Sequence, residues 1–471
     1  MITIVSLGVE KNDWTVRAKE AVLSADKVVL RTGLTASAQT LTEANVPFET
    51  LDGVYEKSRN FETLKKNLAA EVLSRAQGCN HLCYCVDGGV HEDASARLLL
   101  SRKGVTCIEG VTKGVYAASK ANVSGGVQSV SAYDIADVKL TLPLVVYDID
   151  SRDLAGDVKL LLSERFGDEA EAFLLHGGNG KKISLFEADR GEEYDYSTML
   201  VLYDTPLLQK KKFDLDDFMQ VLRALRAPDG CPWDRVQTHE SIRINMIEEA
   251  YELVDAIDAD DPDKICEECG DVLMQAAFHT LMEEERGNFT LTDMLTMLCE
   301  KLITRHTHVF GKDEAKSADG ALSVWDKNKM AEKHQTTYAQ SVNDVPACFP
   351  ALLRAQKVAK RVEKGGWDQD VASVAEEQLL GELKELREAV ESGNASAVHE
   401  ELGDVLMCVV RLGRGVGADC EQALLDATKK IQARYEAYEK RVLLDGKDVH
   451  SLTQEERDAY YREAKKDVEK S

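Results

Sequence analysis

The hydrophobic pattern of the chain changes near residue 205, and this change constrains the fold more than any other feature. Before it, short continuous apolar runs alternate with helical stretches, as expected for buried strands of an α/β domain. After a lysine run at residues 210–212, only helical periodicity with acidic faces continues. We therefore expect an N-terminal α/β domain followed by an all-α region. The expected strands are Ile2–Leu7, Lys27–Leu30, His81–Val86, Pro143–Tyr147, Ala172–Leu175 and Met199–Tyr203.

The helical half contains an internal repeat. Its two copies begin with Trp-Asp motifs, C-P-W-D at Cys231–Asp234 and G-G-W-D at Gly365–Asp368. In each copy an E-x-x-E segment is followed, sixteen positions after its second glutamate, by an acidic E-x-x-D segment. The repeat predicts two similar all-α domains. The two sets of carboxylates are Glu249, Glu252, Glu268 and Asp271 in the first copy, and Glu382, Glu385, Glu401 and Asp404 in the second.

Each set of carboxylates is expected to converge across a pair of helices. Residues three apart share one face of a helix, which applies to Glu249 with Glu252 and to Glu268 with Asp271. The short polar turn at residues 258–263 makes the two helices antiparallel neighbours. Four converging carboxylates repel one another, and a hard cation that prefers oxygen ligands removes the repulsion. Because Mg²⁺ keeps positions open for phosphates, the pattern predicts a Mg²⁺ site for a phosphorylated ligand.

The alternative for both sets is a solvated acidic helix face. The chain has 58 Lys and Arg against 83 Asp and Glu, so acidic faces are common in it. Two observations favour the metal site: the pattern recurs at identical spacing, and a glycine precedes the aspartate in both copies (Gly270 and Gly403). Glycine inside a helix costs roughly 1 kcal/mol relative to alanine, so its repetition indicates a close approach by a neighbouring helix or by metal and phosphate.

Cationic and aromatic side chains near each set could bind the rest of such a ligand. A lysine and an arginine at i,i+4 spacing follow each carboxylate set, and a further basic helix precedes the second Trp-Asp motif. Each basic pair could also be surface decoration, and each tryptophan could stack on a base or close a core. The predicted substrate-binding residues are Trp233, Lys301, Arg305, His306, Lys357, Trp367, Lys430 and Arg434.

The composition bears on partners and location. A net charge of −25 argues against a nucleic-acid or anionic membrane surface. No apolar run reaches the ~18 residues that a membrane-spanning helix needs. Several of the 11 cysteines lie within apolar runs, which is typical of reduced core thiols. We therefore expect a cytoplasmic protein without nucleic-acid or membrane partners.

The span from about Phe213 to Arg441 resembles the MazG nucleoside triphosphate pyrophosphohydrolases in their tandem form. The shared segments are C-P-W-D, E-E-x-x-E at Glu248–Glu252, the two E-x-G-D segments, and Arg305–Gly311. The resemblance implies an all-α fold, a Mg²⁺ requirement, a homodimer, and hydrolysis of a nucleoside triphosphate (NTP) to the monophosphate and diphosphate. It also implies a role in removing surplus or noncanonical nucleotides.

Within this resemblance all eight carboxylates are metal ligands, and those of the first copy are also catalytic. One of the glutamates, or a water activated by the metal, supplies the nucleophile, while Lys301 and Arg305 neutralise charge on the phosphates. In the second copy Gly365 and Gly366 replace Cys-Pro, and Gly381 replaces an acidic residue. Which copy is active is therefore left open.

The first ~205 residues resemble the tetrapyrrole methylase-like α/β domain. The resemblance rests on Val5–Gly8 after the first strand, the glycine turn after strand 82–86, and Ile108–Thr112. It implies S-adenosylmethionine binding at these loops, where the family's G-x-G-x-G-D start is L-G-V-E-K-N-D in this chain. The implied cofactor-binding residues are Gly8, Asp87, Gly88 and Gly89.

Three functions follow from these patterns. The first is a Mg²⁺-dependent nucleoside triphosphate pyrophosphohydrolase. The second is an S-adenosylmethionine-dependent methyltransferase whose helical half serves dimerisation or regulation, and the third is a nucleotide sensor without turnover. The expected domains are 1–207 (methylase-like α/β), 213–340 and 341–445 (MazG-like all-α), and 446–471 (a charged helical tail).

Overall fold

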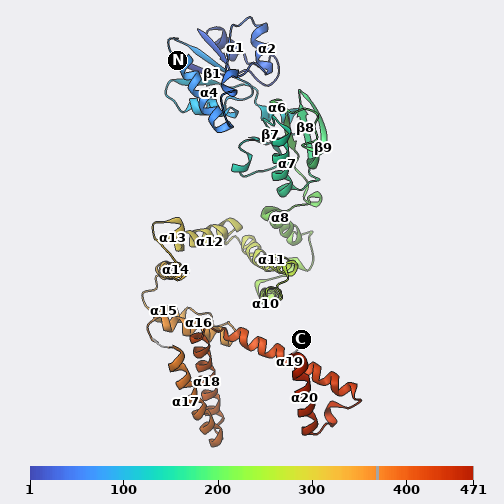
Figure 1. The fold of residues 1–471 in the computed structure, drawn as a ribbon, viewed down its shortest axis with the longest axis vertical. Coiled ribbons are helices and arrows are strands. Elements are labelled where there is room, and N and C mark those ends of the chain that lie inside the picture. The colour runs from blue at the N-terminus through green and yellow to red at the C-terminus, as the bar shows by residue number, and fades with distance from the viewer. Residues whose placement is uncertain (368–370, 470–471) are drawn as a thin grey trace. The chain divides into compact units, whose positions relative to one another are not determined.

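The computed structural model describes residues 1–367 and 371–469, without the side chains of residues 371 and 372. The chain forms two compact units, Met1–Glu285 and Arg286–Ser471, and each is described by itself (Figure 1). Asp368 of the second Trp-Asp motif and the end of the expected tail, residues 470–471, lie outside the described residues. Within the described part of the chain, no helix combines the length and apolarity needed to cross a membrane.

The first unit begins with a parallel five-stranded sheet of order β3-β2-β4-β1-β5. Successive residues of one strand face opposite sides: Ile4 packs with helices α4 and α5, and Val5 packs with α1 and α2. Covering both faces requires the continuous apolar runs seen in the sequence. The elements are β1 (Ile2–Ser6), α1 (Val16–Leu23), β2 (Lys27–Leu30), α2 (Ala36–Glu43), β3 (Glu49–Thr50), α3 (Asp52–Tyr55), α4 (Phe61–Arg75), β4 (Leu82–Val86), η1 (Val90–Glu92), α5 (Ala94–Leu100) and β5 (Val105–Ile108).

A second five-stranded sheet, of order β6-β7-β10-β8-β9, follows in the same unit. Only β6 and β7 pair in parallel; the other pairs are antiparallel. Ala155 and Val158 of α7 cover one face, and Tyr116 and Ala117 of α6 cover the other. The elements are α6 (Lys113–Lys120), β6 (Gln128–Ser131), η2 (Ile135–Asp137), β7 (Leu144–Tyr147), α7 (Arg152–Phe166), β8 (Glu171–His176), β9 (Asn179–Ser184), η3 (Leu185–Glu187) and β10 (Met199–Leu202).

The rest of the first unit is helical, as the sequence predicts. Asp214 caps α8 by accepting from the backbone N–H groups of Asp216 and Asp217. Asp261 does the same at the start of α11, accepting from Asp263 and Lys264, so α10 ends and α11 begins within a few residues. The elements are η4 (Leu207–Gln209), α8 (Leu215–Arg226), η5 (Asp234–Val236), α9 (His239–Ile242), α10 (Asn245–Asp258) and α11 (Pro262–Arg286).

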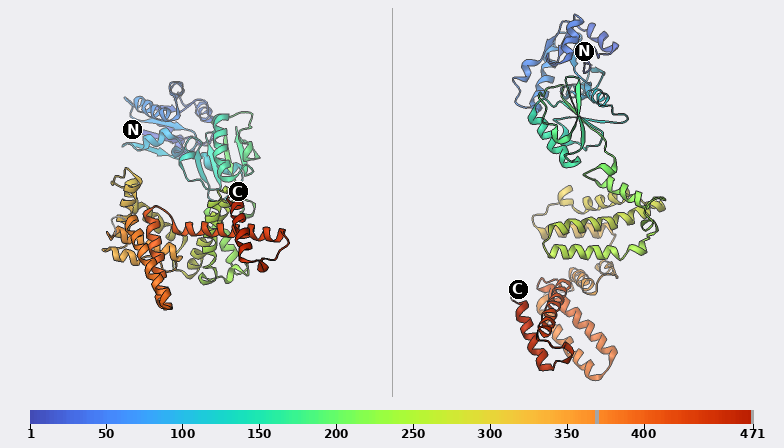
Figure 2. Two further views of the ribbon diagram at one scale, coloured as in Figure 1. Left: turned by 60° about the horizontal axis from the view of Figure 1, so that its bottom comes forward. Right: turned by 90° about the vertical axis from the view of Figure 1, so that its right-hand side faces the viewer.

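The described residues of the second unit form helices joined by turns and loops, without a strand. Helices α17 and α18 form a hairpin (Figures 1 and 2). Its turn contains Gly393, with φ +69°, and Asn394, whose side chain caps α18. The elements are α12 (Leu291–Arg305), α13 (Thr307–Phe310), α14 (Ala318–Glu332), α15 (Tyr338–Asn343), α16 (Ala351–Lys364), α17 (Val371–Ser392), α18 (Ala395–Gly415), α19 (Cys420–Leu444), η6 (Val449–Ser451) and α20 (Gln454–Val468).

Candidate metal and nucleotide site

The first acidic cluster lies where α10 and α11 meet. Glu249, Glu252 and Glu268 each offer a carboxylate oxygen, and these three atoms lie within 4.8 Å of one another. Asp271 lies near them on α11, because its charge acts on both Glu249 and Glu268. The arrangement is the convergence across a helix pair that the spacing predicts.

The electrostatics of this cluster favour a bound cation. Burial, followed by the charges of Asp271 and Glu252, raises the pKa of Glu249 above its usual value. Burial, followed by the charge of Glu252 and other neighbours, also raises the pKa of Glu268. Glu268 Oε2 is buried and has no hydrogen-bond partner among the described residues. Gln275 Nε2 donates to Glu249 Oε1 at 3.4 Å, which leaves most of the negative charge of the cluster without a compensating donor.

The second copy has a similar cluster on α17 and α18, in which Asp404 and not Glu385 completes the converging trio. Oxygens of Glu382, Glu401 and Asp404 lie within 4.8 Å of one another. Burial and the charges of Glu385 and Glu382 raise the pKa of Glu401. Both copies therefore hold like charges close together, which costs free energy unless the carboxylates are protonated or a cation binds.

The residues present fit Mg²⁺. Every donor in the two clusters is a carboxylate oxygen, the ligand type that Mg²⁺ prefers, and no nitrogen or sulfur ligand is mixed in. The buried and unpartnered oxygen of Glu268 is the kind of atom that an ion satisfies. In a solvated acidic face the carboxylates would point into water, whereas Oε2 of Glu268 is buried, which favours an ion at the first cluster.

The two repeated glycines do not meet a neighbouring helix. A Cβ atom built on Gly270 or on Gly403 would find no described atom within 4 Å. The expectation that another helix approaches the chain at these points is therefore wrong for the described residues. Close approach of a metal ion or a phosphate to these glycines stays a prediction.

The cations predicted for the first copy lie in the second unit, on α12 and at its end. Arg305 is buried and donates to both carboxylate oxygens of Glu332, at 2.7 and 2.9 Å, over the ring of Trp325. His306 Nδ1 donates to Leu302 O at 2.7 Å. Lys301 is half-buried, and its charge helps to lower the pKa of Glu332 after the hydrogen bond from Arg305. In its own surroundings Arg305 thus forms a structural ion pair.

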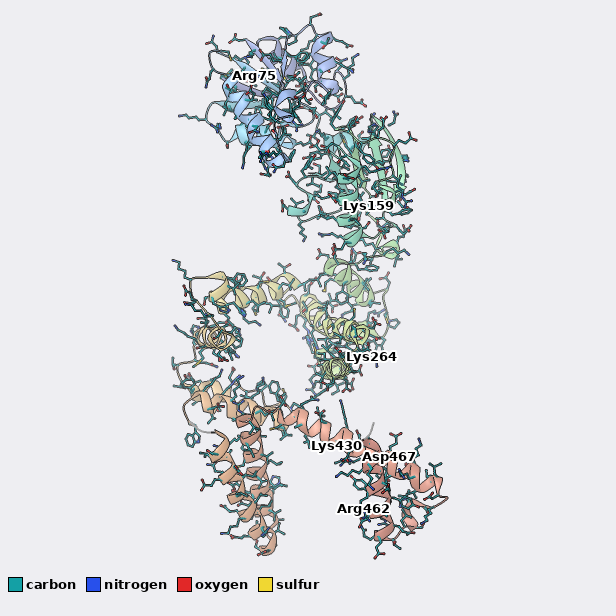
Figure 3. All side chains as sticks on the ribbon, viewed as in Figure 1. Arg75, Lys159, Lys264, Lys430, Arg462 and Asp467 are labelled. Carbon is teal, nitrogen blue, oxygen red and sulfur yellow. The ribbon has the colours of Figure 1, made fainter. Side chains whose placement is uncertain are left out.

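The three cations predicted for the second copy lie at different places in the second unit. Arg434 donates to Glu469 at 3.0 Å near the end of the chain. Lys430 is exposed on α19, a helix that begins beside α16 and α18 and then runs away from them (Figures 1 and 3). Lys357 is exposed on α16, where its charge helps to lower the pKa of Asp419. Their contact with a substrate stays a prediction.

Both tryptophans of the Trp-Asp motifs are exposed, so neither closes a core in its own unit. Trp233 is 61% exposed and Trp367 is 78% exposed. Trp367 lines two hollows of about 200 and 380 Å³. An exposed aromatic side chain beside a hollow is available for stacking on a ligand ring.

Comparing the two copies identifies residues that the spacing of acidic groups did not. Positions 133 residues apart correspond, so Gln275 of the first cluster matches Cys408, and Phe278 matches Arg411. Phe278 is buried, whereas Arg411 lines the 200 Å³ hollow with Trp367 and donates to Gln378, one turn before Glu382. The repeat offset was the signal in the sequence that could have found Arg411.

The glycine turns of the N-terminal domain are closed by the chain's own side chains. A Cβ on Gly8 would lie 2.1 Å from Asp13 Cβ, and one on Gly88 would lie 2.7 Å from Lys113 Cγ. Asp87 is buried and lies 3.1 Å from Lys113 Nζ. Gly89 is packed in the same way against Thr112 and Glu92. Side chains of this chain thus fill the space beside the Cβ positions of these glycines. Binding of S-adenosylmethionine at these turns stays a prediction.

A comparison with protein-family models matches the MazG nucleotide pyrophosphohydrolase domain twice, at residues 237–310 and 372–438. The nucleoside triphosphate pyrophosphohydrolase/pyrophosphatase MazG of Thermotoga maritima is 37% identical over 250 residues, which are 53% of this chain and 95% of that protein. The Escherichia coli K12 nucleoside triphosphate pyrophosphohydrolase is 32% identical over 257 residues, 54% of this chain and 97% of that protein.

These matches define the class of protein: the chain belongs to the MazG nucleotide pyrophosphohydrolase family. The uncharacterized protein YabN of Bacillus subtilis is 29% identical over 100% of this chain and 99% of its own length. A precorrin-6Y methylase structure from Archaeoglobus fulgidus covers 44% of this chain at 16% identity and a TM-score of 0.32. A Thermus thermophilus uroporphyrin-III C-methyltransferase also has a TM-score of 0.32, with 43% of this chain covered at 16% identity.

Proposed function

We propose that this protein hydrolyses a nucleoside triphosphate to the nucleoside monophosphate and diphosphate in a Mg²⁺-dependent reaction. The observation that carries the proposal is the convergence of carboxylates in both copies of the repeat, with one buried oxygen of Glu268 left without a partner. Membership of the family supports the bond that is cut. The positions of the two acidic clusters support the choice of metal-binding and catalytic residues.

Glu249, Glu252, Glu268 and Asp271 would hold Mg²⁺ in the first copy, and Glu382, Glu385, Glu401 and Asp404 would hold it in the second. When bound there, Mg²⁺ would offset the charge of the clustered carboxylates and of the phosphate chain. A water oxygen forms a bond to the α-phosphorus, and the bond from that phosphorus to the bridging oxygen breaks. A glutamate of the cluster accepts the water's proton, and diphosphate leaves with the electron pair. Water and NTP thus give the monophosphate and diphosphate.

The surroundings of the second cluster support a place for the rest of the nucleotide. Arg411 lies one turn of α18 beyond Cys408, and the thiol of Cys408 has a pKa raised by burial and by the charge of Glu382, while Arg411 lowers it. Arg411 also donates to Gln378, one turn before Glu382, and this position supports a contact with a phosphate held at the second cluster. The exposed ring of Trp367 borders the same hollow and is available to stack on the base.

The helix pair α17–α18 also carries exposed apolar side chains, which supports association with a second copy of the chain. Leu380 is 65% exposed on α17, and Leu402 and Leu406 are 46% and 49% exposed on α18. Exposed apolar faces of this kind are expected at interfaces. We propose a cytoplasmic homodimer that removes surplus or noncanonical nucleotides, and light scattering coupled to gel filtration would test the assembly.

The decisive experiment identifies the products and the bond that is cut. The full chain is incubated with NTP and Mg²⁺ in ¹⁸O-labelled water, and diphosphate, orthophosphate and monophosphate are quantified by mass spectrometry. The proposal expects diphosphate without orthophosphate, the label in the monophosphate, and no reaction when EDTA replaces Mg²⁺. Orthophosphate as the only inorganic product would show cleavage at a different bond.

A further inference from the structure

A third group of donor side chains lies in the N-terminal domain, away from both acidic clusters in sequence. His91 belongs to η1, which follows β4, while Cys107 lies in β5 and Glu109 follows that strand directly. Both β4 and β5 pair in parallel with β1, so their carboxyl ends lie at the same edge of the sheet. This edge is where open parallel sheets place ligands.

The three side chains converge. One ligand atom from each of His91, Cys107 and Glu109 lies within 4.8 Å of the others. His91 Nε2 lies 3.5 Å from Glu109 Oε1. Two ligands in a tetrahedral site with bonds of about 2.0–2.1 Å lie roughly 3.4 Å apart, so this pair already has the separation of two ligands of one ion.

Hydrogen bonds hold the turn and the strand end together without an ion. Glu109 Oε2 accepts from the backbone N–H of Val90 at 2.8 Å, and Glu109 Oε1 accepts from that of His91 at 3.3 Å. Cys107 is part-buried and packs against the core on that side of the sheet. The imidazole of His91 is 70% exposed, so it can turn toward an ion without disturbing the core. The backbone positions of the three ligands are thus fixed in advance.

The donor set differs from that of the acidic clusters. A thiolate, an imidazole and a carboxylate are together typical of Zn²⁺, whereas the all-carboxylate clusters suit Mg²⁺. The Cys266-x-x-Cys269 pair on α11 belongs to none of the three groups that the described residues form. We propose that His91, Cys107 and Glu109 form a Zn²⁺ site with three protein ligands and a fourth position open to water.

The site would tie the end of β5 to the turn after β4. Glu92, the next residue after His91, already accepts from the backbone N–H of Gly89 and of Lys113, both at 2.7 Å. An ion held by His91 would therefore fix the turn that begins at Gly88 and leads from β4 into η1, which Glu92 already ties to the first residue of α6. This role is structural and does not depend on hydrolysis of a nucleotide by the helical half.

Zinc binding to the full chain tests the proposal. The protein is stripped with EDTA, dialysed into excess Mg²⁺ to occupy the acidic clusters, and titrated with Zn²⁺ under equilibrium dialysis with metal analysis. We expect one Zn²⁺ per chain, and affinity at least about tenfold weaker in Cys107→Ser and in His91→Ala. Because His91 is exposed, its variant keeps the test valid if the cysteine variant does not fold. The matched control, Cys266→Ser with Cys269→Ser, should bind like the unmodified chain.

Cobalt substitution adds a spectroscopic readout of the ligands. Co²⁺ in the site should give a thiolate-to-metal charge-transfer band in the near ultraviolet, and Cys107→Ser should abolish it. Full zinc affinity in Cys107→Ser, or loss of binding in the Cys266/Cys269 control instead, would overturn the proposal. So would an unmodified chain that binds no zinc. Each of these results leaves diphosphate release by the helical half unaffected.

Discussion

At the residue scale, Lys113 shows how deeply a charge can be buried when its partners are fixed. It is 4% exposed, and its Nζ atom lies 2.6 Å from Asp148 Oδ1 and 3.1 Å from Asp87 Oδ2. Burial alone would raise the pKa of Asp87, but Lys113 and Arg31 outweigh it and hold that pKa below its usual value. The ion pairs therefore keep both charges in the interior of the N-terminal domain.

Lys113→Met is expected to destabilise the N-terminal domain by about 3–5 kcal/mol, because two carboxylates lose their main partner in a buried setting. Lys120→Met is the matched control, since Lys120 is exposed and its pair with Glu10 contributes less than about 1 kcal/mol. Hydrogen exchange at the amides of β1 and β4 measures the free energy of opening in each variant. Equal protection in the two variants would contradict the role given to Lys113.

At the scale of elements, the helix pairs α10–α11 and α17–α18 present the same carboxylates on different surroundings. The space beside Gly270 and Gly403 is open in both pairs. One turn beyond Gln275 and Cys408, the first pair buries Phe278, whereas the second presents Arg411 to a hollow. On the proposed function, the repeated carboxylates would hold the metal ion in both copies, and the residues that differ would set how each copy contacts the rest of the nucleotide.

Gly403→Ala tests what approaches α18. Because the new Cβ meets no atom of the described residues within 4 Å, the change should stabilise the ion-free protein by up to about 1 kcal/mol through helix propensity. If a phosphate approaches the backbone there, the same change should raise KM for NTP. Thermal unfolding and steady-state kinetics measure the two effects. A more stable variant with an unchanged KM would show that a phosphate does not approach the backbone at Gly403.

Arg411→Phe installs the residue that the first copy has at this position. In a background of Glu268→Ala with Asp271→Ala, so that only the second cluster is intact, it should raise KM about tenfold. A charge-assisted hydrogen bond to phosphate is worth about 1.5–3 kcal/mol, and 1.4 kcal/mol is a factor of ten. Arg411→Lys should recover part of the loss. Arg387→Gln, an exposed arginine on α17, is the control, and an equal effect there would refute a specific contact.

At the scale of the whole molecule, burial decides what the sequence could predict. All six expected strands lie where the structure has β1, β2, β4, β7, β8 and β10, because continuous apolar runs mark buried strands. Strand β9 was not expected, since its Asn179–Ser184 sequence is polar and its lysines are exposed at a sheet edge. Strands β3, β5 and β6 were also missed, being two to four residues long with polar members.

The same reasoning separates the parts of the site that spacing predicts from those that it does not. The i,i+3 carboxylates converge because a helix fixes which residues share a face. The ion pair between Arg305 and Glu332 depends on packing between α12 and α14, so no local sequence pattern predicts it. The open space beside Gly270 likewise follows from the tertiary arrangement and not from the helix itself.

Metal removal should change the stability of the whole chain in a pH-dependent way. The pKa values of Glu249, Glu268 and Glu401 are raised in the ion-free fold, so the stability they contribute is present at low pH and lost as the pH rises through them. Glu268→Gln with Glu401→Gln should therefore raise the unfolding temperature in EDTA more at pH 7 than at pH 4. It should also reduce the increase that Mg²⁺ produces. An equal increase in unfolding temperature at pH 7 and pH 4 would contradict repulsion between the clustered carboxylates.

The central claim is that the acidic clusters hold the ion on which NTP hydrolysis depends, and one comparison tests it most directly. Diphosphate release from NTP and Mg²⁺ is measured for the unmodified chain and for a variant with Glu268, Asp271, Glu401 and Asp404 all changed to alanine. In the control variant, Glu267 and Glu400 are changed to alanine; they are exposed neighbours of the cluster at matching positions of the two copies. We predict loss of at least about 1000-fold in the first variant and nearly full activity in the control. If the variant with four alanine substitutions is folded and still releases diphosphate at the rate of the unmodified chain, the acidic clusters do not hold the ion that hydrolysis needs.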